Sequence, residues 1–193
     1  GLVRATMDNP DASRDGAYIF REVDGGDFDV DTSITELSGA SSTWTAGILI
    51  QDPDTPGDWA LMGLGRSSGS RVWMLRATLS DVSAEQSVAR SAALQPQFLR
   101  LTRVGPAVTG YYRDSAADPW TAIGGAASVP LPAKVRIGLV LETTEPAGGA
   151  DFDYLHFSSG GLATCSRSEA DCAERNNLHD LNRFRNMPNG LLQ

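Results

Sequence analysis

The sequence predicts an all-β protein, built as an antiparallel sandwich of about ten short strands. Segments in which apolar and polar residues alternate recur along the first 158 residues, and turns rich in glycine, proline or aspartate separate them. No long helical pattern interrupts this part of the chain. The chain has 193 residues, 41% of them hydrophobic, without an internal repeat or interior linker. We therefore expect one domain with a sizeable core.

The clearest pair of strands is a predicted hairpin over residues 98–113. Leu99 and Leu101 share one face of the first strand, because side chains alternate along a strand with a period of two. Gly105 and Pro106 form the turn, since glycine permits a positive φ and proline fixes φ and removes a backbone donor. A second alternating strand follows the turn.

Residues 27–37 alternate in the same way. Phe28 and Val30 lie on one predicted face and Asp29 and Asp31 on the other, which is typical of a half-buried strand. The other predicted strands cover residues 17–23, 44–50, 59–65, 71–79, 135–142 and 151–157, with residues 80–93 ambiguous between a loop and a loop plus one strand at 88–93.

Two of these strands have informative patterns. Residues 44–50 are a nearly continuous apolar run, which predicts a central strand buried on both faces. Residues 71–79 alternate, with Trp73 and Leu75 on the face opposite to Met74. A sandwich of this size must also protect its sheet edges, and the prolines of the chain fall where edges and loops are expected.

The character of the sequence changes after residue 158. Ser166 and Glu169 match a capping box, in which each side chain satisfies a free backbone N–H at a helix start. A thin apolar stripe at helical spacing follows, made of Ala170, Ala173, Leu178, Leu181 and Phe184. A helix of about 20 residues is too short to be stable alone in water, so we expect it to pack on the sandwich or on another protein. The predicted parts are an N-terminal arm or edge segment at residues 1–15, the sandwich at 16–158, and a C-terminal helix and tail at 159–193.

The formal net charge is −8 and the pI is about 4.7. This argues against a nucleic-acid partner, because affinity for a phosphate backbone comes mainly from lysine and arginine. The charge is compatible with cations, neutral sugars or a protein partner, although an acidic surface is also an ordinary means of staying soluble. No apolar stretch is long enough to predict a membrane span.

Cys165 and Cys172 are the two cysteines, and six residues separate them. This spacing matches neither a zinc site nor a redox motif. We expect a disulfide that closes a short loop, and the alternative is two unpaired thiols. A disulfide indicates an oxidising compartment, so we expect a periplasmic or extracellular protein. No signal peptide is present, so the expectation is a processed mature chain or an excised domain.

Five stretches of the sequence carry a resemblance to a known family. They are, in order, residues 99–105, 110–112, 120–124, 135–141 and 151–157. Together they resemble the bacterial concanavalin A-like (laminin-G-like) jelly-roll domains, which occur in secreted bacterial proteins and at the C-terminus of some β-xylosidases. The resemblance spans about residues 16–158 and implies a jelly-roll sandwich, but no single function, because this superfamily holds lectins, glycosidases and adhesion modules.

The sequence does not predict an enzyme. Of its two histidines, His156 falls in a predicted strand, where a surface position is the ordinary expectation. Motifs of serine hydrolases and zinc proteases are missing, and so is the carboxylate pattern of a glycosidase cleft. Asp27, Asp29 and Asp31 are spaced by about 7 Å along one strand face, but no glutamate acid or aromatic cleft accompanies them.

Calcium is the one metal that the sequence suggests. Jelly rolls of the resembled kind often hold a structural calcium near the start of the last strand, which implies Asp151 and Asp153 as ligands here. Hard cations favour such carboxylate oxygens. The alternative is that both carboxylates are simply solvated. The aspartates of residues 27–31 imitate the start of an EF-hand loop, but the glycine and glutamate that such a loop needs later are missing.

Sugar binding needs aromatic rings exposed on a face or loop, where they can stack on pyranose rings. Trp59 follows a turn-rich loop at residues 52–58, so we expect it to be partly exposed. For Trp44 and Trp73 the core is the ordinary expectation, and the resemblance implies a structural role for Trp120.

These observations favour a non-catalytic module outside the cytoplasm that docks, through its termini, onto a larger protein assembly of the cell envelope. The alternative is a carbohydrate-binding, lectin-like module of a secreted protein, in which Trp59 would contact the glycan. An open concave face around Trp59 would favour the sugar, and exposed apolar surface on the arm and tail would favour the assembly. The residues expected to dock are Leu178, Leu181, Phe184, Leu191 and Leu192.

Overall fold

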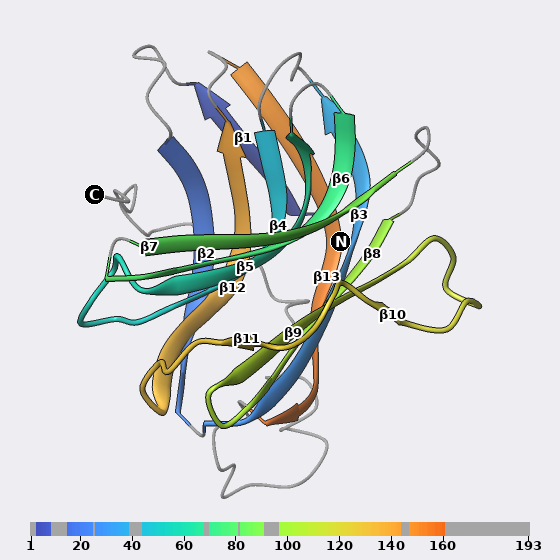
Figure 1. The fold of residues 1–193 in the computed structure, drawn as a ribbon. Coiled ribbons are helices and arrows are strands. Elements are labelled where there is room, and N and C mark those ends of the chain that lie inside the picture. The colour runs from blue at the N-terminus through green and yellow to red at the C-terminus, as the bar shows by residue number, and fades with distance from the viewer. Residues whose placement is uncertain are drawn as a thin grey trace, which may run out of the picture.

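A computed structural model describes residues 3–8, 15–24, 26–38, 44–67, 70–80, 82–90, 97–143 and 147–160. These residues form two antiparallel β-sheets that pack face to face as a sandwich (Figure 1). The structure therefore confirms the all-β sandwich that the alternation predicted. In this part of the chain, no helix is long and apolar enough to cross a membrane.

The first sheet has seven strands in the order β1-β13-β3-β8-β9-β10, and β11 also pairs with β9. The N-terminal segment contributes an edge strand, β1, which pairs with the long last strand β13. The predicted hairpin is formed by β8 and β9. The strands are β1 (Val3–Asp8), β3 (Phe28–Ser38), β8 (Gln97–Val104), β9 (Ala107–Arg113), β10 (Thr121–Ala122), β11 (Ala127–Ser128) and β13 (Ala147–Gly160).

The second sheet has six strands in the order β2-β12-β4-β5-β6-β7. Strand β4 lies at its centre and every one of its residues is buried, which confirms the central strand predicted from the apolar run. The strands are β2 (Asp15–Asp24), β4 (Trp44–Gln51), β5 (Trp59–Ser67), β6 (Ser70–Leu79), β7 (Val82–Ala89) and β12 (Lys134–Thr143).

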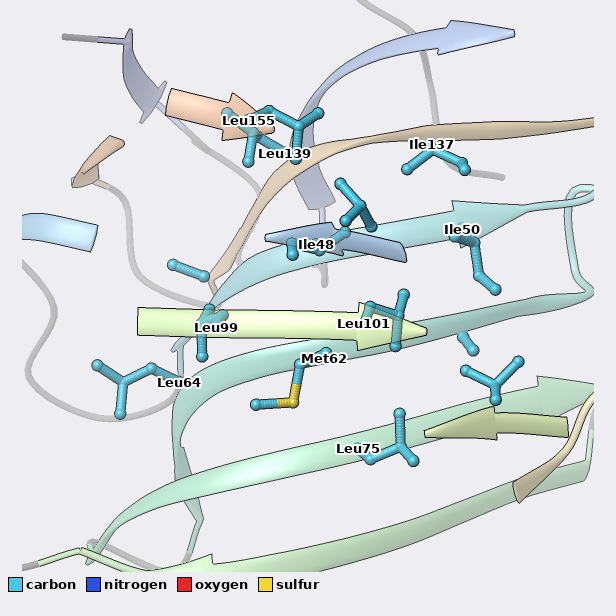
Figure 2. Packing of buried hydrophobic residues seen from close by; sticks show 14 of the residues in the cluster. Ile48, Ile50, Met62, Leu64, Leu75, Leu99, Leu101, Ile137, Leu139 and Leu155 are labelled. Atoms are coloured by element: carbon cyan, nitrogen blue, oxygen red, sulfur yellow. The ribbon is translucent and has the colours of Figure 1, made fainter. Parts of the chain in front are cut away.

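The core lies between the two sheets and is filled by alternate residues of each strand. Phe28 and Val30 of β3 are both buried, as predicted. In Figure 2, Leu99 and Leu101 of β8 lie in one cluster with Met62 of β5, which belongs to the opposite sheet. Burial of such side chains contributes about 1.5–3 kcal/mol each.

Strand β7 differs from the prediction. The sequence suggested a strand at residues 88–93, whereas β7 runs from Val82 to Ala89. Most of its side chains are exposed, so β7 has no apolar period from which its bounds could be predicted.

The predicted C-terminal helix and tail lie almost entirely outside the described residues, which end at residue 160. The cysteine pair and the docking positions lie outside them too, so the disulfide and the docking residues stay predictions. These positions are Cys165, Cys172, Leu178, Leu181, Phe184, Leu191 and Leu192.

Candidate functional site

The outer face of the six-stranded sheet, which we call the six-strand face, holds an apolar cluster separate from the core. Residues that point away from the core along each strand point onto this face. Tyr18 and Trp59 pack against the cluster from β2 and β5. The cluster itself is buried, and the partly buried side chains of Tyr18 and Trp59 beside it make this face the candidate site. The buried members of the cluster are Leu49, Leu61, Val72, Met74 and Val140.

Glycines lie at crowded positions of the six-stranded sheet. A Cβ atom on Gly47 would lie 2.1 Å from a backbone oxygen of β5, and one on Gly138 would lie 1.9 Å from a backbone oxygen of β2. In both cases the neighbouring strand curls toward the outer side of the sheet. At Gly63 and Gly65 side chains fill the space instead, since Thr45 Cγ2 lies 2.7 Å from the first Cβ position and Met74 Cε lies 2.6 Å from the second. The backbone contacts at Gly47 and Gly138 indicate that the sheet curls toward this side, so the six-strand face is concave there.

An ion pair crosses this concave face. Arg76 of β6 donates from Nη2 to the Glu142 carboxylate of β12, although β4 and β5 lie between these two strands. Three strand intervals span about 14 Å in a flat sheet, so the contact requires the curvature that the glycines allow. The side chains of Arg76 and Glu142 are only 9% and 17% exposed. The Arg76 Nε is buried, and no described residue accepts a hydrogen bond from it.

Trp59 lies beside this ion pair. The Arg76 guanidinium carbon is 5.1 Å from the centroid of the Trp59 ring, a cation–π contact. The indole is half-buried, as the sequence led us to expect, and its cross-strand neighbours are Gln51 and Thr78. Around Trp59 the face thus combines an indole ring, a guanidinium, a carboxylate and neutral polar groups.

The loop before Trp59 is held in place by its own hydrogen bonds. The Asp52 amide donates to the Asp58 carbonyl at 2.9 Å, and Gln51 Nε2 donates to the Pro56 carbonyl at 2.9 Å. The Ser80 amide donates to Asp58 Oδ1 at 2.7 Å, which ties the loop to the end of β6. These contacts fix the rim next to the indole before any ligand arrives.

Tyr18 closes the opposite side of the face. Its hydroxyl donates to the Leu49 carbonyl at 3.2 Å, so the side chain reaches from β2 across β12 to β4. Burial raises the pKa of Tyr18 well above its ordinary value, and the nearby Arg136 only partly opposes this. Tyr18 therefore stays a neutral hydrogen-bond donor. Arg136 itself lies 5.0 Å from the centroid of the Phe20 ring.

The other three tryptophans lie elsewhere. Trp44 and Trp73 are buried in the core, as expected. Trp120 lies on the first sheet, with the guanidinium carbons of Arg113 and Arg100 at 4.3 and 5.8 Å from its ring centroid. Trp59 is thus the tryptophan of the six-strand face.

The aspartates of β3 have partners rather than a common site. Asp29 forms a bidentate pair with Arg100. Asp31 Oδ1 is 3.0 Å from His156 Nδ1, and the side chain of His156 is about half exposed. Burial, aided by the charge of Asp31, raises the pKa of Tyr154 beside them. These carboxylates lie on the outer face of the first sheet and do not contribute to the six-strand face.

The two proposed calcium ligands lie at an irregular point of β13. The strand register shifts between Asp151 and Phe152, where Asp151 is buried and Asp153 is exposed. Within the described residues, no group of three histidine, cysteine, aspartate or glutamate side chains could hold a metal ion. Calcium binding at Asp151 and Asp153 therefore stays a prediction.

A thermal melt checks the calcium prediction. Saturating calcium stabilises a folded state that binds it by about 2.7 kcal/mol at 100 times the dissociation constant, which corresponds to several degrees for a chain of this length. Chelator should reverse the shift, and Asp153→Asn should abolish it. Identical melts with calcium and with chelator would contradict calcium binding.

Trp59 was the one residue of the six-strand face that the sequence analysis selected. Arg76 and Glu142 were missed because they are 66 residues apart and pair only across a curved sheet. A usable signal was present in Gly63 and Gly65, since glycine inside a strand indicates close backbone approach or a bulge.

Comparisons with known proteins identify the fold but not a family. No protein-family profile matches this chain, and no curated protein matches it. A functionally unknown protein from Saccharomyces cerevisiae superposes with a TM-score of 0.65 at 19% identity, covering 77% of this chain and 76% of that one. A xylan β-1,4-xylosidase from Bacillus halodurans C-125 has a TM-score of 0.66 at 13% identity, covering 82% of this chain and 33% of that one.

The carbohydrate-binding module CBM66 from Bacillus subtilis is also similar, with a TM-score of 0.55 at 15% identity, covering 82% of this chain and 96% of that one. This chain therefore has the size of that module but spans only about a third of the xylosidase. At these identities the likeness shows a shared β-sandwich fold. The finer concanavalin A-like assignment stays a prediction from the sequence.

Proposed function

We propose that this chain is a non-catalytic accessory module that binds a carbohydrate on the six-strand face. The observation that carries the proposal is the half-buried indole of Trp59 beside the Arg76–Glu142 ion pair, on a sheet that curls toward this face at Gly47 and Gly138. Sugars need this mixture, since their C–H faces stack on aromatic rings while their hydroxyl groups both donate and accept hydrogen bonds.

Each group has a distinct role in this proposal. Trp59 offers a stacking surface at the rim of the face. Arg76 supplies donors only and Glu142 supplies acceptors only, so that a pair of neighbouring sugar hydroxyls could be recognised by both side chains. Gly47 and Gly138 let the neighbouring strands curl toward this side, which gives the face its concave curvature.

We propose binding without hydrolysis. Cleavage of a glycosidic bond needs two carboxyl groups on either side of that bond. On this face the Glu142 carboxylate is paired with the Arg76 guanidinium instead of facing a second carboxyl group. The similarity in size and fold to a carbohydrate-binding module supports this proposal. Docking through the termini stays a prediction that rests on residues outside the described part of the chain.

Replacing the indole tests the proposal. A glycan array that includes β-1,4-xylo-oligosaccharides should yield a ligand for the unmodified protein. Calorimetry should then show about five- to thirtyfold weaker binding for Trp59→Ala, because stacking contributes about 1–2 kcal/mol. Trp120→Ala is the matched control, because it removes an indole from the other sheet and should leave the affinity unchanged. An equal loss of glycan affinity in both variants, or the absence of any ligand on the array, would contradict the proposal.

A further inference from the structure

Strand β7 is an edge of the six-stranded sheet, and no strand of the described residues pairs with its outer side. It is the last strand in the order of that sheet, it is eight residues long, and most of its side chains are exposed. Val82, at its start, is 72% exposed and is one of the two exposed large hydrophobic residues in the described part of the chain. Edges of this kind are normally shortened, bulged or charged, because their free backbone groups pair readily with another strand.

The hydrogen bonds of β7 show which of its backbone groups are free. Arg90, directly after the strand, donates its amide to the Arg71 carbonyl at 3.0 Å, so residues 90 and 71 form a hydrogen-bonded pair. The register of β6 and β7 is unbroken, and hydrogen-bonded pairs alternate with non-bonded pairs in an antiparallel ladder. The even-numbered residues of β7 therefore bond to β6. The groups that point away from β6 belong to Ser83, Glu85, Ser87 and Ala89.

The composition of β7 places no barrier against pairing. Glu85 is its only charged residue, and it contains neither proline nor glycine. At the other edge of the same sheet, β2 presents Arg21, Glu22 and Asp24, and Glu22 is paired with Lys134 at 2.7 Å. Charged side chains of this kind discourage strand addition at β2. In the part of the chain that the structure describes, β7 is therefore the edge of this sheet that is better suited to pair with a further strand.

We propose that β7 pairs antiparallel with β7 of a second copy of this chain, which joins the two six-stranded sheets into one. Two copies related by a twofold axis at Gln86 would place Ser83 opposite Ala89 and Glu85 opposite Ser87, and these are the four residues with free backbone groups. This register keeps the two Glu85 carboxylates from facing each other, whereas a shift that centres the axis on Glu85 would place like charges together. Two copies that each carry a net charge of −8 repel one another, so they must meet where the local charge is low. Strand β7 meets this condition, because Glu85 is its only charged residue.

The contact is small. Stable interfaces bury about 1,200–2,000 Å² in total, more than one pair of short strands supplies, so the dimer should depend on protein concentration. Pairing would also set two six-strand faces side by side. The inference does not depend on carbohydrate binding, since it rests on the edge of the sheet alone.

Sedimentation velocity over a range from low micromolar to several hundred micromolar tests the inference. The unmodified chain should pass from monomer to dimer. Ser87→Pro removes a free N–H that β6 does not use, so it should weaken the dimer at least tenfold while keeping the thermal midpoint. Ser87→Thr keeps that N–H and should dimerise normally. If the chain stays monomeric at every concentration, the inference is wrong. This holds also if β7 pairs with a strand of another protein but not with a second copy.

Disulfide trapping tests the register without a proline. Across the proposed axis, Gln86 meets Gln86 of the partner in a non-hydrogen-bonded pair, where Cβ atoms lie about 4.5–5.5 Å apart, close to the range of a disulfide. Gln86→Cys should therefore give a covalent dimer whose 86–86 link is identified by peptide mass. Ala84→Cys should not, because its partner position is Val88. Faster trapping at position 84 than at 86 would overturn the proposed pairing.

Discussion

Replacing Gly47 by alanine is expected to destabilise the protein by about 3–5 kcal/mol, as much as a large core truncation. The new Cβ would lie 2.1 Å from the Met62 carbonyl oxygen and 2.6 Å from the Gly63 Cα, and neither backbone atom can rotate away. Strands β4 and β5 must therefore separate at the centre of the sheet, where both are buried. Equilibrium unfolding in denaturant measures the effect.

Gly125→Ala is the matched control, since no atom lies within 4 Å of its Cβ position. At such a site alanine is neutral or stabilises by about 0.4–1 kcal/mol, because it restricts the unfolded chain. If Gly47→Ala and Gly125→Ala unfold at the same denaturant concentration, the close approach of β4 and β5, and with it the concave six-strand face, is wrong.

Removing one partner of the Arg76–Glu142 pair is expected to cause the second large loss of stability. Arg76→Met would leave the Glu142 carboxylate in a largely buried position without this cation, and loss of one member of a buried pair costs about 3 kcal/mol or more. Glu142→Leu should cost a similar amount. The double variant should be markedly more stable than the sum of the two losses predicts, because apolar groups replace both charges.

A double-mutant cycle in denaturant measures the coupling, which we expect to be about 1–3 kcal/mol. The Lys134–Glu22 pair at the edge of the same sheet is the control. Both of its side chains are substantially exposed, so Lys134→Met should change stability little. If the double variant loses as much free energy of unfolding as the two single variants together, Arg76 and Glu142 do not interact across the face.

The sequence predicted the core strands well because burial leaves a pattern. Phe28 and Val30 alternate with aspartates along β3, which indicates that one face of this strand is buried. The nearly continuous apolar run of β4 indicates that both of its faces are buried. Strand β7 has exposed residues on both faces and therefore no such signal. Its bounds were set by the backbone ladder to β6, which a single sequence does not display.

The candidate site was harder to predict than the fold. Trp59 could be selected because it follows a turn-rich loop. The partnership of Arg76 with Glu142 depends on how strongly the sheet curls, and that curvature comes from glycines on two different strands. The sequence pattern excludes an EF-hand loop at the aspartates of β3 but does not indicate their partners. Asp29 and Asp31 pair with Arg100 and His156 from the neighbouring strands β8 and β13.

The indole N–H signals of the four tryptophans test the central claim most directly. Each tryptophan gives one such signal in a nitrogen–proton correlation spectrum, and single substitutions to phenylalanine assign them. During titration with an oligosaccharide ligand, the account predicts that the Trp59 signal shifts in a saturable way. The signals of Trp44 and Trp73, in the core, and of Trp120, on the other sheet, should stay in place. A saturable shift at Trp120 with none at Trp59 would contradict the assignment of the six-strand face as the binding site.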